Sequence, residues 1–123
     1  MKHTSKFTAL LIAATLVAGP AFSESFKRIR KEADYRAMVV DRTITAGSGS
    51  FIVHSNGTIS GQIPSGALSG KWQWNQKFFC RTIAVAGKTA GTGCTVIKVS
   101  KDGKTLVVIG DKGKAEPKTY TIN

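Results

Sequence analysis

The stretch that decides the fold is GKWQWNQKFFCRTIAVAGKTAGTGC, residues 70–94. It contains both cysteines of the chain, Cys80 and Cys94, on two predicted antiparallel strands. If the cysteines face each other, Val85 faces Thr89, and a three-residue loop that contains a glycine joins the strands. A disulfide across this hairpin would set its register, since a shift of one residue turns every side chain to the other face. The stretch therefore predicts a stapled hairpin in a β-rich domain.

The first 23 residues have the pattern of an export signal. Two lysines open it, an apolar run follows at residues 7–18, and small residues stand at the cleavage positions within 21–23. The apolar run is too short to span a bilayer well. We therefore expect a signal peptide over residues 1–23, a single mature domain over residues 24–123, and a periplasmic or secreted location.

Export favours a disulfide between Cys80 and Cys94, because an exported chain meets an oxidising compartment. The rival interpretation is a pair of metal-ligating thiolates. Zinc would need two further ligands, and residues 24–123 contain one histidine, His54. A disulfide that closes a loop of about 15 residues stabilises a fold by about 3 kcal/mol in the chain-entropy model. We expect the disulfide, no metal site and no cofactor.

The chain is basic, with 18 Lys and Arg against 7 Asp and Glu and a formal net charge of +11. Lys2 and Lys6 belong to the leader, and the one dense cluster beyond it lies at residues 27–31. Such a protein attracts anionic lipid headgroups and acidic polysaccharides. The alternative interpretation, which we favour, is a solvated surface that keeps the protein soluble. No segment after the leader is long and apolar enough to span a membrane.

Outside the central hairpin, the pattern predicts one helix and a series of short strands. Residues 25–41 contain helix formers and apolar residues that can share a face. From residue 50 on, turn residues recur about every 8–12 positions, which is typical of an antiparallel sandwich or barrel. Asn56-Gly57, the strongest short hairpin signal, separates two of these strands and requires positive φ at both turn residues. The predicted strands are 51–54, 58–63, 68–74, 77–85, 93–99, 105–109 and 118–123.

These elements predict a mainly β (α+β) fold. We expect a short N-terminal helix and an antiparallel sheet of six or seven strands, curled into a small barrel or sandwich and joined by one disulfide.

Four side chains are candidates for contact with a ligand or partner: Trp72, Trp74, Phe78 and Arg81. Trp72 and Trp74 share one face of their strand, where they either pack in the core or line a ligand cleft. Phe78 and Phe79 point to opposite faces, so one is a core residue and the other forms a second buried layer or an exposed contact. Arg81 interrupts an apolar strand, where it either binds an anion or faces solvent.

Residues 24–123 carry few groups suited to catalysis. His54 is their one histidine, and Ser55 beside it points to the opposite face of a strand. The glycines within residues 46–50 precede a strand, whereas those of a dinucleotide-binding turn precede a helix. No segment has the pattern of a nucleophile elbow. The sequence therefore predicts a protein that is not an enzyme.

The chain resembles a group of small exported proteins of Gram-negative bacteria through four motifs, Gly70-Lys71-Trp72-Gln73-Trp74, Phe79-Cys80-Arg81, Cys94 and Asp111-Lys112-Gly113. The resemblance covers residues 26–114 and implies an exported domain with a leader, a short helix and a pair of strands joined by a glycine turn. The group has no established activity. Its members are sometimes labelled dihydrodipicolinate reductase, a label that this sequence does not support because it lacks the nucleotide-binding fingerprint.

Together these features predict a non-enzymatic binding or interaction module of the cell envelope. Its partner would be an envelope component, an apolar or anionic ligand, or a secreted enzyme, whereas export argues against nucleic acid. The alternative is an inhibitor of a secreted hydrolase of the protease or lysozyme type. A deep apolar pocket near Trp72 and Trp74 would favour ligand binding, and a filled core with a rigid protruding loop would favour inhibition.

Overall fold

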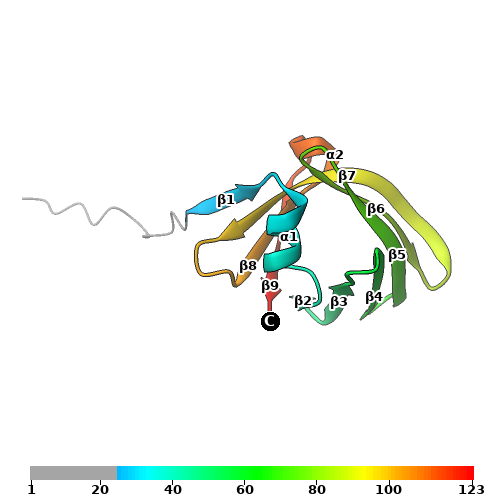
Figure 1. Ribbon diagram of the computed structural model, residues 1–123. Coiled ribbons are helices and arrows are strands. Elements are labelled where there is room, and N and C mark those ends of the chain that lie inside the picture. Colours follow the sequence, from blue (N-terminus) through cyan, green and yellow to red (C-terminus); the bar gives the residue numbers. More distant parts are fainter. Residues whose placement is uncertain (1–24) are drawn as a thin grey trace, which may run out of the picture.

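Nine strands and two short helices make up residues 25–123, the part of the chain that the computed structural model describes (Figure 1). The predicted signal peptide, residues 1–23, lies outside the described residues. The elements in chain order are β1 Phe26–Ile29, α1 Glu32–Met38, β2 Thr43–Ala46, β3 Gly49–Val53, β4 Thr58–Ile63, β5 Gly66–Asn75, β6 Phe78–Val85, β7 Lys88–Ser100, β8 Thr105–Ile109, α2 Gly110–Gly113 and β9 Pro117–Ile122.

Strands β2 to β9 form a closed antiparallel barrel in which each strand pairs with the next one in sequence. Pairing of the last strand with β2, in which Ile44 faces Ile122, closes the circle. Strand β1 pairs with the part of β7 that β6 does not reach, and there Ile29 faces Ile97. The fold is therefore an eight-stranded barrel with one additional strand.

The barrel confirms the predicted mainly β, antiparallel fold with one disulfide, and it decides between the two architectures that the sequence left open. All seven predicted strands are present, and β1 and β2 are added to them. The predicted helix over residues 25–41 was wrong at its beginning, because Phe26–Ile29 is a strand and the helix spans Glu32–Met38. The reason is tertiary: the end of β7 offers unpaired backbone groups, and β1 satisfies them.

The β6–β7 hairpin carries the disulfide at the predicted register. Cys80 faces Cys94, with their sulfur atoms 2.08 Å apart and their Cα atoms 4.0 Å apart. The predicted loop was too long by one residue, since Val85 does not face Thr89 and the turn consists of Ala86-Gly87 alone. Both turn residues have positive φ, 50° and 78°, as a tight hairpin turn requires. A β-bulge between the turn and the disulfide absorbs the difference of one residue.

The turn between β3 and β4 contains Asn56-Gly57, as predicted. Gly57 has a φ of 90°, and its N–H donates to the carbonyl oxygen of His54 at 3.1 Å. Positive φ occurs at Gly57 and not at Asn56, so this part of the prediction was wrong. The Asn56 side chain instead accepts the backbone N–H of Thr58 at 3.1 Å, which closes a turn wider than two residues.

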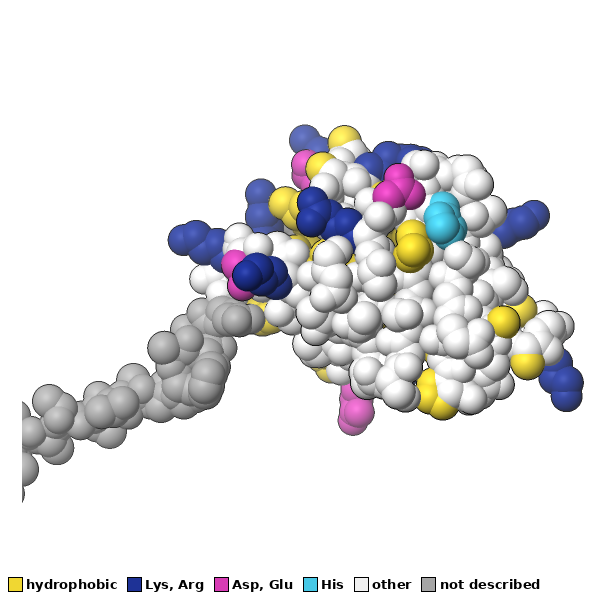
Figure 2. Space-filling model, turned by 90° about the horizontal axis from the view of Figure 1, so that it is seen from below, with side chains coloured by type: hydrophobic (Ala, Val, Ile, Leu, Met, Phe, Trp, Pro, Cys, Tyr) yellow, Lys and Arg dark blue, Asp and Glu magenta, His cyan; other side chains and the backbone are white. Residues whose placement is uncertain are grey.

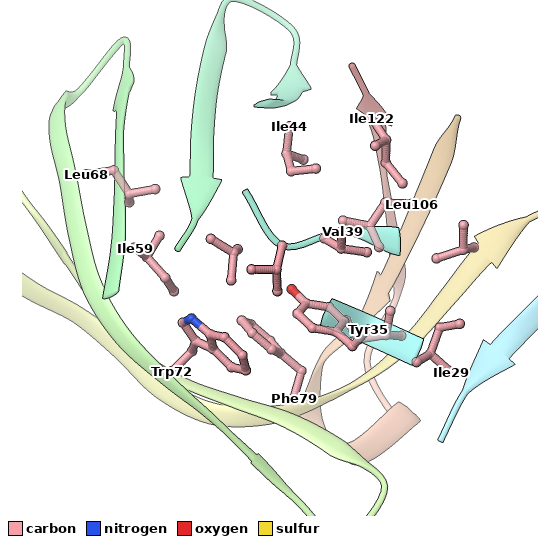
Figure 3. Packing of buried hydrophobic residues seen from close by; sticks show 14 residues of the cluster. Ile29, Tyr35, Val39, Ile44, Ile59, Leu68, Trp72, Phe79, Leu106 and Ile122 are labelled. Atoms are coloured by element: carbon pink, nitrogen blue, oxygen red, sulfur yellow. The ribbon is translucent and has the colours of Figure 1, made fainter. Parts of the chain in front are cut away.

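One end of the barrel is filled by an aromatic cluster around α1. Tyr35 projects from α1 into the barrel and is 1% exposed. The centroid of its ring lies 5.7 Å from that of Trp72, 5.2 Å from that of Trp74 and 5.0 Å from that of Phe79. Figure 3 shows Tyr35, Trp72 and Phe79 converging among aliphatic side chains from the surrounding strands. We call this end, covered by α1, the closed end.

Candidate functional site

The barrel interior is only partly filled, and a cavity of about 300 Å³ remains inside it. Side chains alternate between the two faces of each strand, so every strand of the barrel presents residues to this cavity. The lining consists of Tyr35, Ala46, Gly49, Phe51, Val53, Ile59, Ile63, Leu68, Phe79, Arg81, Ile83, Ile97, Leu106, Val108 and Tyr120. Most of these side chains are apolar, which suits the apolar part of a small molecule.

The cavity lies where large inward side chains give way to small ones. Successive antiparallel strands alternate in direction, so the turns β2–β3, β4–β5 and β6–β7 lie at the end of the barrel away from α1. We call this the open end. Its inward positions include Ala46, Gly49, Ile63 and Ile83, whereas four aromatic rings occupy the closed end. Ala46 is exposed, so solvent reaches the lining at the open end.

Two inward glycines show how unevenly the interior is packed. A Cβ atom on Gly61 would stand 2.6 Å from the Cβ atom of Phe51 on the neighbouring strand, so this glycine permits a close approach of β3 and β4. A Cβ atom on Gly93 would have no other atom within 4 Å. Gly93 faces Arg81 across the β6–β7 pair, which leaves free space beside that arginine.

Arg81 brings a positive charge to this apolar interior. It shares the inner face of β6 with Phe79 and Ile83, lines the cavity and is half-buried. Of the described residues in the lining, Arg81 is the one that carries a charge. The described residues form one ion pair, between Arg36 and Glu32 at 2.7 Å. No acidic side chain of the described residues pairs with Arg81. Arg81 therefore lines the cavity without a counter-charge from the described chain.

Arg81 also borders a groove of about 380 Å³ on the outer face of β5, β6 and β7. This groove is lined by outward residues such as Lys71, Gln73 and Thr82, by the two cysteines of the disulfide, and by Trp72 and Gly93, which do not line the cavity. Because Arg81 occupies an inward position of the strand that separates the two spaces, we assign its side chain to the cavity.

Tyr35 and Tyr120 supply the hydroxyl groups of the lining. Burial raises the pKa of Tyr35 far above its usual range. Burial also raises the pKa of Tyr120, and the positive charge of Arg81 offsets part of that shift. The Tyr120 ring packs edge-on against Phe51, with the two centroids 5.7 Å apart. Both tyrosines therefore stay neutral at physiological pH and can donate hydrogen bonds.

Trp72 and Trp74 belong to the aromatic cluster at the closed end and are not part of the cavity lining. Trp72 is 7% exposed, and its indole N–H donates to the carbonyl oxygen of His54 at 2.8 Å. The indole N–H of Trp74 donates to the carbonyl oxygen of Gln76 at 2.9 Å. The core-packing interpretation of Trp72 is therefore confirmed, and Trp74 is partly buried against the same core.

Phe78 and Phe79 point to opposite faces, as predicted, and Phe79 is the core residue. Phe78 lies outside the barrel, where three cations surround its ring: Arg28 at 5.5 Å, Lys77 at 5.8 Å and Lys112 at 5.7 Å from the centroid. Most of the Lys and Arg side chains on the face drawn in Figure 2 lie toward the side where the described chain begins. None of the three cations around Phe78 lines the cavity.

The remaining candidates for chemistry lie on the outer surface. Nε2 of His54 is 2.6 Å from Oγ of Ser60. Asp41 accepts the backbone N–H of Ser55 at 3.1 Å, so within the described chain the imidazole of His54 has no carboxylate partner. Within residues 25–123, no group of three His, Cys, Asp or Glu side chains is placed to hold a metal ion. In the same residues, no helix has the length and apolar character needed to cross a membrane.

Sequence reasoning singled out Arg81 but missed Tyr35, Phe51 and Tyr120. A signal was present for Phe51, because inward and outward positions alternate along its strand. Tyr35 and Tyr120 could not be found in this way. The direction of Tyr35 depends on where α1 packs, and Tyr120 reaches the cavity because its strand pairs with β2 from the far end of the chain.

No family model, no curated protein and no solved structure matches this chain. Its cavity and side-chain geometry are therefore the basis for a functional proposal.

Proposed function

We propose that this protein is an exported, non-enzymatic binding protein that holds a small, mainly apolar molecule inside its barrel. The observation that carries the proposal is the cavity of about 300 Å³, apolar on nearly all sides and covered by α1 at the closed end. The interior of an eight-stranded barrel is either filled by side chains or wide enough to hold one small ligand. Ligand sites are typically clefts of about 300–1,000 Å³ with a few polar groups that set orientation, and this cavity fits that description.

The size of the cavity limits the ligand. At about 30 Å³ for each group the size of a water molecule, the cavity holds roughly ten non-hydrogen atoms. An aliphatic chain of medium length or a single small ring system is of this size, whereas a whole phospholipid is much larger. The disulfide supports export, because such bonds persist in oxidising compartments.

The alternative function, inhibition of a secreted hydrolase, would use the β6–β7 hairpin. Its turn, Ala86-Gly87, is exposed, and the disulfide joins its strands. Such a hairpin suits insertion into an enzyme cleft, but that function makes no use of the cavity. Unfilled space costs stability through lost packing contacts, so a cavity that is retained favours ligand binding.

The test is a titration of the oxidised protein with octan-1-ol, a neutral molecule of suitable size, followed by NMR of the backbone amides. We expect one molecule to bind and the largest shifts to fall on the residues that line the cavity. Val108→Phe fills the cavity from β8 and should weaken binding at least about tenfold, because the ring occupies the space of the ligand.

Val107→Phe is the matched control. Val107 and Val108 are neighbours on β8, so the same change at Val107 places the ring on the outer face and should leave octan-1-ol binding unchanged. Absence of binding of both octan-1-ol and the acid of the same length, octanoate, to the wild-type protein would contradict the proposed function, and so would equal weakening of octan-1-ol binding in the two variants.

A further inference from the structure

We infer that the molecule bound in the cavity is an amphipathic monoanion, whose acidic group pairs with Arg81 while its apolar part extends toward Tyr35. The inference rests on the proposed function, because it names the chemical class of the ligand for the same cavity. Three features of the lining carry it: the position of Arg81 along its strand, the absence of a counter-charge in the described chain, and the free space and hydroxyl group near it.

Along β6, Arg81 lies between two other lining residues, Phe79 toward the closed end and Ile83 toward the open end. Strand β6 runs from the turn after β5, at the closed end, to the β6–β7 turn at the open end, and Arg81 comes after the buried Phe79. Arg81 itself is half-buried. A ligand that enters from the open end with its apolar part first therefore leaves its head group at the level of Arg81.

The charge of Arg81 is unbalanced within the described chain. The described chain contains six acidic residues, and all of them lie outside the cavity lining: Glu32, Asp34, Asp41, Asp102, Asp111 and Glu116. A guanidinium group keeps its charge at every physiological pH and forms its strongest hydrogen bonds with carboxylate and phosphate oxygens. Because Arg81 is half-buried, it loses part of its contact with water, and an anionic head group on the ligand would compensate for that loss.

The surroundings of Arg81 leave room for a head group and offer a second donor. Gly93 faces Arg81 on the neighbouring strand, and a Cβ atom built there meets no other atom within 4 Å. Tyr120 lies near enough for the charge of Arg81 to influence its hydroxyl group. Because burial raises the pKa of Tyr120, the hydroxyl stays protonated and can donate to an anion at neutral pH.

The deeper part of the cavity suits an apolar chain. It is lined by aliphatic and aromatic residues, among them Ile97, Leu106 and Phe79, which are 1%, 2% and 5% exposed. The single polar group at this depth is the hydroxyl of Tyr35, which burial keeps neutral. The lining therefore has one charged region and one apolar region, as an amphipathic acid does.

Octanoate and octan-1-ol have the same chain length and differ in the head group. Comparing their affinities therefore tests the role of the acidic group separately from that of the apolar chain. We expect the oxidised protein to bind octanoate at least about tenfold more tightly than octan-1-ol at pH 7 and low salt. Arg81→Gln should weaken octanoate binding about 10- to 100-fold, the usual cost of a lost hydrogen bond to a charged group, and should weaken octan-1-ol binding by a clearly smaller factor.

Lys71→Gln is the matched control, since it removes one positive charge from the outer groove on the other side of the sheet. It should change octanoate binding by less than about twofold, because exposed charges interact weakly through water. Equal affinity of the wild-type protein for the two ligands, or an equal loss in Arg81→Gln and Lys71→Gln, would overturn the inference and leave the proposed function intact. Failure of both ligands to bind would overturn the proposed function itself.

A measurement on the wild-type protein keeps the test decisive if Arg81→Gln does not fold. As the pH falls below the pKa of the ligand carboxyl group, at about 4–5, octanoate becomes neutral while the guanidinium keeps its charge. The preference for octanoate over octan-1-ol should then disappear. A preference that is the same on both sides of this pKa would show that Arg81 does not pair with the acid.

Discussion

The closed and the open end of the barrel are built from the same eight strands but are packed in different ways. At the closed end, the ring of Tyr35 lies within 5.7 Å, centroid to centroid, of three other aromatic rings. Toward the open end, a cavity of about 300 Å³ remains, and its lining includes small residues such as Ala46 and Gly49. Dense packing stabilises a fold, whereas a cavity forgoes those contacts. Dense packing and unfilled space are therefore separated along the barrel axis, which allows one end to remain hollow.

The largest expected effect is that of Tyr35→Ala at the closed end. Tyr35 is 1% exposed, and truncation of a buried aromatic side chain lowers the free energy of unfolding by about 3–5 kcal/mol. Tyr120→Ala is the matched control at the open end, where half-burial beside a cavity predicts about half that loss or less. Urea unfolding followed by circular dichroism measures both. A loss for Tyr120→Ala as large as that for Tyr35→Ala would mean that the two ends are packed alike.

Removal of the disulfide should have the next largest effect. The double variant Cys80→Ser/Cys94→Ser opens a closed loop of about 15 residues, and its free energy of unfolding should fall by about 3 kcal/mol. Reduction of the wild-type protein serves as the control and should produce a similar loss. Because the cysteines face the outer groove, the affinity for octan-1-ol should stay unchanged when the variant is folded. Full stability of the double variant would show that the disulfide does not stabilise this barrel.

The smallest expected effect concerns the two inward glycines. Gly61→Ala forces a methyl group to within 2.6 Å of the Cβ atom of Phe51, and overpacking of this kind costs about 1–3 kcal/mol. Gly93→Ala enters free space and should change the free energy of unfolding by no more than about 0.5 kcal/mol. Equal effects of the two substitutions, measured by thermal unfolding, would remove the contrast between tight and open parts of the interior.

The strand pattern was predictable because it depends on neighbouring residues. Alternation of side chains, turn residues and the two cysteines located all seven strands of the prediction and the disulfide. The first strand was not predictable, since Phe26–Ile29 contains residues that also suit a helix, and its strand conformation depends on pairing with β7. The same holds for β2, whose short sequence pairs with both β3 and β9.

The candidate site was only partly predictable. Arg81 stood out in the sequence, but its direction did not, because strand β6 carries apolar residues on both faces. Phe79 and Ile83 share its inner face, while Phe78 and Cys80 lie on the outer face. With apolar side chains on both sides, alternation alone does not tell which face lies inside a closed barrel.

By itself, the sequence determined a small, basic, mainly β domain with regular turns and a stapled hairpin, because these features depend on residues close together in the chain or on the chemistry of two cysteines. Only the tertiary structure decided that the sheet closes into a barrel, that α1 fills one end, and that Arg81 lines a cavity inside the barrel. Closure joins Ile44 to Ile122, residues from opposite ends of the described chain. Contacts of that range follow from the packing of the whole sheet, which local sequence patterns do not encode.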